Sequence, residues 1–427
     1  MTDATPSTTP APERPAPPVP GAPEKQDDRG SRLLREITTG NAAISVLAVV
    51  LALVISGVLI AFTTPAVQAT TGYFFSRPAD FFQAFWTTVS SAYSSLFQGA
   101  VYNFRVDGFA AGIRPLTETL NYSVPLIAAG LGVALAFRVG LFNIGARGQI
   151  LIAAAAAGWV GFSFDLPIWV HLPLALLAGI AGGAVWGGIV GLLKARTGAH
   201  EVILTIMLNY VAFYLIAYML RTPGLLQAPG SPNPKAPATL PSAILPDLFG
   251  SRYNLNLGFV IVVVITAVVW WLINRSTLGF RFRAVGENPH AARTAGMNVK
   301  NIYLYAMLIS GALAGVAGST QVLGTLTTGF SSGIDAGIGF DAITVALLGR
   351  SRPWGVFGAG ILFGALKAGG YSMQAADGVP IDIVLVVQSL IVLFVAAPPL
   401  VRSIFRLPAP GARPVRKAST KEAVVTK

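Results

Sequence analysis

Apolar residues recur in long runs along most of this 427-residue chain, and short polar stretches separate the runs. A run of about 20 apolar residues has the length that an α-helix needs to cross the hydrocarbon core of a bilayer. We therefore expect an all-α, polytopic integral membrane protein with broken or half helices among its spans. The pattern predicts ten spans, at residues 42–62, 119–138, 146–164, 173–192, 201–220, 257–274, 301–323, 338–349, 355–370 and 381–399.

Three segments modify this simple picture. The span at 338–349 is too short to cross about 30 Å at about 1.5 Å per residue, which predicts a half-helix or a tilted segment. Residues 63–118 are rich in Phe, Trp and Tyr, which indicates either a helix lying in the membrane interface or an aromatic belt that anchors neighbouring spans. Residues 222–256 contain PGSPNPKAP and predict an external Pro-rich loop.

The two ends of the chain differ in composition from its middle. Residues 1–35 are dominated by Pro, Ala, Thr and charged residues, which cannot form a packed core, so we expect a disordered cytoplasmic tail. Residues 407–427 form a second, basic cytoplasmic tail. The transmembrane domain is therefore expected to occupy residues 36–406.

Positive charge predicts the orientation of the spans. If the N-terminus is cytoplasmic and the spans alternate, 23 of the 30 Lys and Arg residues lie inside and six lie outside. Cytoplasmic loops are enriched in Lys and Arg, so the distribution favours both termini inside. The net charge of +12 then follows from topology, and we expect no nucleic-acid binding.

Composition excludes several classes of function. Only 11% of the residues are charged and 53% are hydrophobic, whereas soluble domains have about 25% charged residues. Cysteine is absent, and His171, His200 and His290 are far apart in sequence, so we expect neither a metal centre nor a cofactor. There is no G-x-x-x-x-G-K-[ST] motif and no paired base and nucleophile, so we expect a non-catalytic protein.

The segment GLFNIGARGQ, residues 140–149, interrupts the apolar pattern at a predicted helix start. Its glycines disfavour a continuous helix, and irregular backbone persists in a membrane only where protein or water satisfies it. Two alternatives stay open: the amides of this region line a solute pathway, or they form hydrogen bonds between packed helices. The candidate pathway residues are Asn143, Gln149, Asn209, Asp341 and Gln388, and Asp341 can instead cap a helix start.

A second polar segment, residues 275–306, lies on the predicted cytoplasmic side. Asn288 and Pro289 form a helix start signal, and Gly296 is a stop signal two turns later. A short helix held between two spans can dock on a partner protein, or it can simply connect the two spans.

Four stretches resemble, in order, the permeases of ABC importers for branched-chain amino acids, ribose and nucleosides. They are GLGVALAFRVGLFNIGARGQ, EVILTIMLNYVA, AVGENPHAARTAGMNV and GFDAITVALLGRSRPWG, and the likeness to nucleoside and simple-sugar permeases is the strongest. The resemblance covers residues 119–400. The chain departs from the family pattern at Arg147, where these permeases have an acidic residue before Gly-Gln.

The resemblance implies a permease subunit that moves nucleosides or related small polar solutes across a bacterial plasma membrane by alternating access. It implies partners: two ATPase subunits, a second, heteromeric permease and an extracellular solute-binding protein. A ribose-like sugar permease is the alternative, and an ion-coupled secondary transporter is a more distant one. The resemblance makes residues 286–296 the segment that couples to the ATPase, with contacts expected at Glu287, Asn288, Ala291, Ala292, Arg293 and Gly296.

Overall fold

The computed structural model describes residues 41–250 and 252–406. The predicted tails, at 1–35 and 407–427, lie outside these residues. Within the described residues the secondary structure is helical and no β-strand forms, apart from one isolated bridge between Asp247 and Asn256. The prediction of an all-α fold is confirmed.

Each of the ten predicted spans lies on a helix of the described chain. Six helices are long and apolar enough to cross a membrane; they are α2 (Asn41–Thr63), α6 (Arg114–Arg138), α8 (Ile168–Thr197), α9 (Glu201–Met219), α10 (Gly258–Arg275) and α13 (Val299–Thr320). Two apolar helices are shorter, α14 (Ile338–Leu348) and α16 (Asp382–Ala396). The remaining two predicted spans correspond to α7 (Ala146–Ser163) and α15 (Pro353–Asp377). The chain is therefore a polytopic membrane protein, and the number of crossings stays a prediction.

The segments between the spans carry further short elements. Residues 63–118 contain α3 (Pro65–Thr71), α4 (Pro78–Ala100) and α5 (Phe109–Gly112). The inner part of α4 packs on α15, whereas Phe82 and Trp86 are exposed. The other elements are the 3₁₀ turn η1 (Pro241–Ala243), α11 (Thr277–Glu287), α12 (Pro289–Thr294), the π-helix η2 (Gln321–Thr325) and α17 (Pro398–Ile404).

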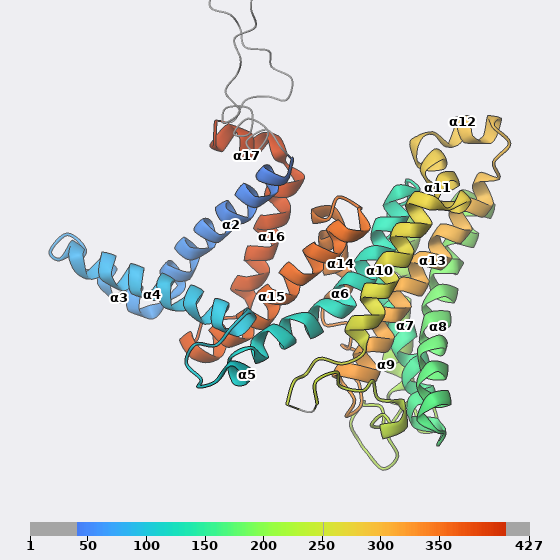
Figure 1. The fold of residues 1–427 in the computed structure, drawn as a ribbon, viewed down its shortest axis with the longest axis horizontal. Helices are drawn as coiled ribbons and strands as arrows, with labels where there is room; N and C mark the ends of the chain where they lie inside the picture. Colours follow the sequence, from blue (N-terminus) through green and yellow to red (C-terminus); the bar gives the residue numbers. More distant parts are fainter. Residues whose placement is uncertain (1–40, 251, 407–427) are drawn as a thin grey trace, which may run out of the picture.

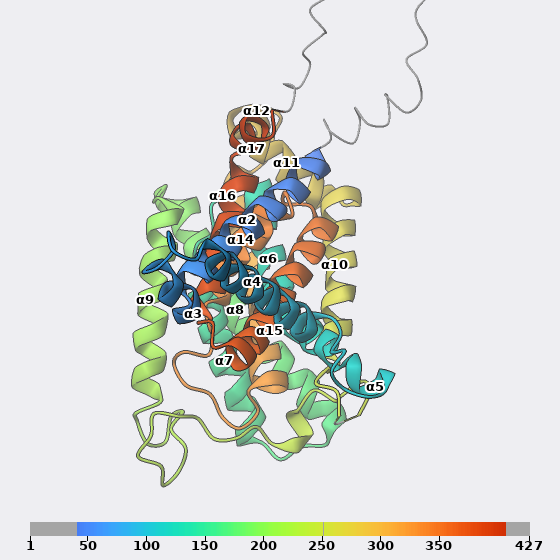
Figure 2. The ribbon, with the colours of Figure 1, turned by 90° about the vertical axis from the view of Figure 1, so that its left-hand side faces the viewer.

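The helices form a main bundle with a smaller group beside it (Figure 1). Helices α6 to α10, α13 and α14 make up the bundle, and α2, α16 and α17 pack together at its side. Helix α4 extends crosswise from this smaller group (Figures 1 and 2). Helix α15 joins the two parts, because it contacts α6 and α14 as well as α4 and α16.

Helices α8 and α13 form the most extensive contact in the bundle, through glycines. Four glycines of α8 recur every fourth residue, and α13 presents Gly311 and Gly315. A Cβ atom at Gly311 would lie 2.3 Å from the carbonyl oxygen of Gly183. The two backbones therefore touch directly, as in small-residue interfaces of membrane helices. The glycines of α8 are Gly179, Gly183, Gly187 and Gly191.

The molecule has two distinct ends along the direction of the spans. Helix α12, helix α17 and the beginning of α2 lie at one end, and η1 with its surrounding loops lies at the other (Figure 1). We call these the α12 end and the η1 end. The predicted coupling segment thus lies at the α12 end, and the Pro-rich loop lies at the η1 end.

Candidate functional site

The broken segment between α6 and α7 is fixed by the amide of Asn143, which is fully buried. Its Nδ2 donates to Ser310 Oγ at 2.8 Å, and its Oδ1 accepts from the backbone N–H of Gly145 at 2.8 Å. Ser310 in turn donates to the carbonyl of Gly132 at 2.7 Å. One amide therefore ties the segment to both α13 and α6.

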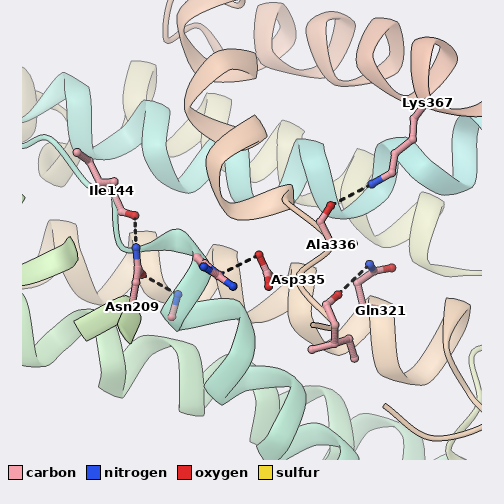
Figure 3. Close-up of polar contacts among 9 residues, drawn as sticks. Ile144, Asn209, Gln321, Asp335, Ala336 and Lys367 are labelled. Carbon is pink, nitrogen blue, oxygen red and sulfur yellow. Dashed lines mark hydrogen bonds and ion pairs between the residues drawn. The ribbon is translucent and has the colours of Figure 1, made fainter. Parts of the chain in front are cut away.

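Two further amides complete this arrangement. Asn209 of α9 donates to the carbonyl of Ile144 at 2.9 Å and accepts from the N–H of Gly148 at 2.8 Å (Figure 3). Gln149 and Asn143 approach each other at 3.2 Å and 3.4 Å. Protein groups thus satisfy the irregular backbone, as a membrane interior requires. In this conformation the three amides act in helix packing, and their contact with solute stays a prediction.

Helices α7 and α14 begin inside the bundle and nearly meet there. The start of α7 is held by Asn209 and Ser310. Asn209 lies about midway along α9, and Ser310 lies about midway along α13. A Cβ atom at Gly339, in the first turn of α14, would lie 2.5 Å from the backbone N and Cα of Arg147. Both helix N-termini, which carry partial positive charge, therefore face one region. Broken helices of transporters present such termini to their solutes.

Charged side chains gather where these two helices begin. Arg147 Nε lies 3.3 Å from a carboxylate oxygen of Asp335, which is only 3% exposed, and its guanidinium lies 5.2 Å from the centre of the Phe213 ring. Lys367 of α15 donates to the carbonyl of Ala336 at 3.3 Å (Figure 3). The loop before α14 is thereby held from both α7 and α15.

Asp341 adds the fourth charge of this group. It lies in the first turn of α14, where no side chain caps the helix, and its charge interacts with that of Lys367. Its place in the first turn still suits the partial positive charge of the helix start, so both the capping and the pathway role of Asp341 stay predictions. We call Arg147, Asp335, Asp341 and Lys367 the charged cluster; its two cations and two anions sum to zero. Ionisable groups inside a membrane protein mark functional pathways more often than structural ones.

Other predicted residues lie elsewhere. Gln388 is buried on α16, a helix that packs on α2, α14 and α15, so it is separate from the three amides. His171 is buried and bonds to Ser242 at 2.8 Å and to the Val160 carbonyl at 2.9 Å. Within the described residues, no group of three or more His, Asp or Glu side chains is placed to hold a metal ion.

Most of the charged cluster is not evident from the sequence. Asp335 lies between the predicted spans at 301–323 and 338–349, and Lys367 lies inside the predicted span at 355–370 without an oppositely charged neighbour in that span. Arg147 and Asp335 are 188 positions apart, so no local pattern connects them. The available signal was that each is an isolated charge within an apolar region, which calls for an opposite charge nearby.

The predicted coupling segment forms the helix α12 as expected. The Asn288 side chain accepts hydrogen bonds from the N–H groups of His290 and Ala291, each at 3.0 Å, and Gly296 ends the turn with a φ of 82°. The preceding α11 was not predicted. The two alanines differ in burial, because Ala292 packs into the helix bundle and Ala291 is exposed. The exposed members of the predicted contact set are Glu287, Asn288, Ala291, Arg293 and Gly296.

Three features together define a membrane-spanning transport subunit. They are a bundle in which two helices begin opposite each other, a charged cluster whose charges cancel, and an exposed helix at one end. Residues 116–396 match the family model described as branched-chain amino acid transport system / permease component. The chain belongs to this family. Its members are transport components and not enzymes.

Individual relatives agree with this assignment. The chain is 42% identical to the guanosine ABC transporter permease protein NupP of Bacillus subtilis, over 73% of this chain and 86% of that protein. It is 38% identical to the glucose ABC transporter permease protein TsgB13 of Haloferax volcanii, over 65% and 75% of the two chains. It is also 28% identical to NupQ, a second guanosine permease of Bacillus subtilis, over 58% and 78%. No solved structure matches the chain.

Proposed function

We propose that this chain is the permease of an ATP-driven importer for nucleosides in a bacterial plasma membrane. The observation that carries the proposal is the 42% identity to a guanosine permease over most of both chains. The charges of the charged cluster cancel, so the cluster does not favour an ionic solute, which is consistent with an uncharged, hydroxylated one. The glucose permease among the relatives makes a sugar the second candidate.

ABC permeases work with ATPase subunits and a solute-binding protein, and this sequence itself has no phosphate-binding loop. We propose that the ATPase binds the α12 end, so that this end and both chain termini are cytoplasmic. The second permease is proposed to be a different chain, because two guanosine permeases of one organism both resemble this one. Arg293 is the one permanently charged residue of α12, so the rest of this helix can pack closely on a partner without burying a charge.

Transport would occur by alternating access, and the charged cluster would lie on the solute pathway. In the present conformation the Arg147–Asp335 ion pair links the start of α7 to the loop before α14. Separation of these helices would break this link. ATP hydrolysis in the partner would change the position of α12, and the elements packed on α12 would transmit this movement to the charged cluster.

The proposal is tested by uptake of labelled nucleosides and sugars into proteoliposomes that contain the permease pair, the ATPases and the binding protein. ATP-dependent uptake of guanosine is expected, with little uptake of glucose. Uptake of guanosine without ATPases would contradict the proposal and favour an ion-coupled transporter.

The neighbouring alanines of α12 give a paired test of ATPase docking. Ala291→Glu places a charge on the exposed face, so we expect loss of ATPase co-purification with normal permease folding. Ala292→Glu places the charge in the permease core and should impair folding itself. Thr197→Glu, at the exposed last residue of α8, is the control. Wild-type ATPase binding and uptake in Ala291→Glu would show that α12 is only a connector.

A further inference from the structure

A cavity of about 740 Å³ opens at the η1 end between α4, α5, α6, α15 and the loop at 252–254. Its size falls in the range of small-molecule sites, about 300–1,000 Å³. The helices that line it are the outer parts of α6 and α15, whose inner parts approach the charged cluster. The polar and aromatic side chains around it are Arg114, Glu118, Tyr122, Arg252, Asn254 and Tyr371.

Two tyrosines form one wall of this cavity. The ring centres of Tyr122 and Tyr371 are 5.8 Å apart, and the ring planes are inclined by 36°. Tyr122 is partly buried, whereas Tyr371 is 47% exposed. Tyr371 is thus about half exposed, which leaves ring surface for contact with a flat ligand. Aromatic side chains stack on any nucleobase, because every base has a π-face.

The polar groups are suited to the edge of a base. The Asn254 amide donates to the carboxylate of Glu118, and the Tyr253 hydroxyl donates to the carbonyl of Ala110 at 2.9 Å, so these loop residues are tied to α6 and α5. Glu118 is an acceptor for N–H groups. Arg114 and Arg252 are donors of the kind that bind the O6 and N7 atoms of guanine.

The cavity also lies in line with the charged cluster. Lys367 precedes Tyr371 by four residues on α15, so the two side chains occupy the same helix face one turn apart. Ala368, between them in sequence, lines the cavity. The cavity therefore adjoins the turn of α15 that carries Lys367.

We propose that this cavity is the external acceptor site of the importer, in which a nucleoside stacks its base on Tyr371 and Tyr122. Glu118 and the two arginines recognise the polar edge of the base. The inference rests on the proposed function, and it adds the residues that receive the solute from the binding protein.

The test uses the assembled importer in proteoliposomes with two measurements. In the first, 8-azidoguanosine is photo-crosslinked and the labelled peptides are mapped. Labelling is expected in the segments around residues 118–122 and 371–372, with protection by excess guanosine and none by D-ribose. In the second, guanosine uptake is measured for Tyr371→Leu and Tyr371→Phe. Loss of the ring should raise KM about tenfold, whereas Phe should keep KM within about twofold.

Tyr218→Leu is the matched control, because Tyr218 is 63% exposed at the η1 end of α9 and does not line the cavity. A wild-type KM in Tyr371→Leu, or labelling only elsewhere, would overturn the inference. Equal protection by D-ribose would show that the base is not what is recognised, and loss of binding-protein capture would show a docking surface instead. Absence of guanosine uptake by the wild-type importer refutes the proposed function, whereas uptake with an unlabelled cavity refutes this inference alone.

Discussion

Substitution of Asn143 by Ala decides between the two roles of the amides in the broken segment. The change removes the acceptor of the Gly145 N–H and the donor to Ser310, each at 2.8 Å in a fully buried place. A buried polar group without a partner costs about 1–3 kcal/mol. Ser310 keeps its own bond to Gly132, and the contacts to Gln149 are longer, at 3.2 Å and 3.4 Å. We therefore expect a loss of about 2–4 kcal/mol in the free energy of unfolding.

The assay measures thermal unfolding of the purified permease and nucleoside uptake per assembled complex. Asn143→Ala should lower the unfolding temperature and the yield, while uptake per complex stays within about twofold of wild type. Asn274→Ala is the control, because Asn274 is exposed and its amide donates to the Trp270 carbonyl within its own helix, at 2.8 Å. It should leave unfolding unchanged.

The opposite pattern would refute this reasoning. If Asn143→Ala unfolds as wild type does but binds nucleoside about threefold to tenfold more weakly, the lost bond is one to solute, worth about 0.5–1.5 kcal/mol. Asn143 would then line the pathway in a conformation other than the present one.

Two further predictions concern packing and charge. Gly311→Ala places a Cβ atom 2.3 Å from the carbonyl oxygen of Gly183, so the helices must separate and stability should fall by about 1–3 kcal/mol in thermal unfolding. Gly358→Ala, where no atom lies within 4 Å of the added Cβ, should have no such effect; equal losses would contradict the packing argument. Asp335→Asn should destabilise the permease by about 2–3 kcal/mol, less than a fully buried pair, because the Arg147 side chain is 29% exposed. A double-mutant cycle with Arg147→Gln measures the coupling, and additive effects would exclude it.

Features with local causes were predictable from sequence. The capping of α12 by Asn288 and its end at Gly296 follow from residue types within two turns of each other. The spans follow from apolar runs, although α15 continues to Asp377 beyond the predicted end at 370. Gly369 and Gly370 lie at the predicted end, but both pack against neighbouring helices and the helix persists.

Features that depend on tertiary contacts were not predictable. The isolated amides of Asn143 and Asn209 fit a pathway as well as a packed interface, because an amide does not specify its partner. The burial of Ala292 and exposure of Ala291 depend on how α12 lies on α13 and α11. The Arg147–Asp335 pair requires that a loop enters the bundle from the η1 end, which composition does not reveal.

The glycine contact between α8 and α13 limits how the transporter can move. Glycines recur every four residues on α8, which corresponds to about 6 Å of helix rise. If α8 slid along α13 by one or two residues, larger side chains would meet the backbone of the other helix. The two helices can therefore pack closely only when their glycines are aligned, which happens once every four residues. Helices α8 and α13 must therefore move as one rigid body during transport. Any hinge of the cycle is therefore to be found outside this pair, at the segments that lead into α7 and α14.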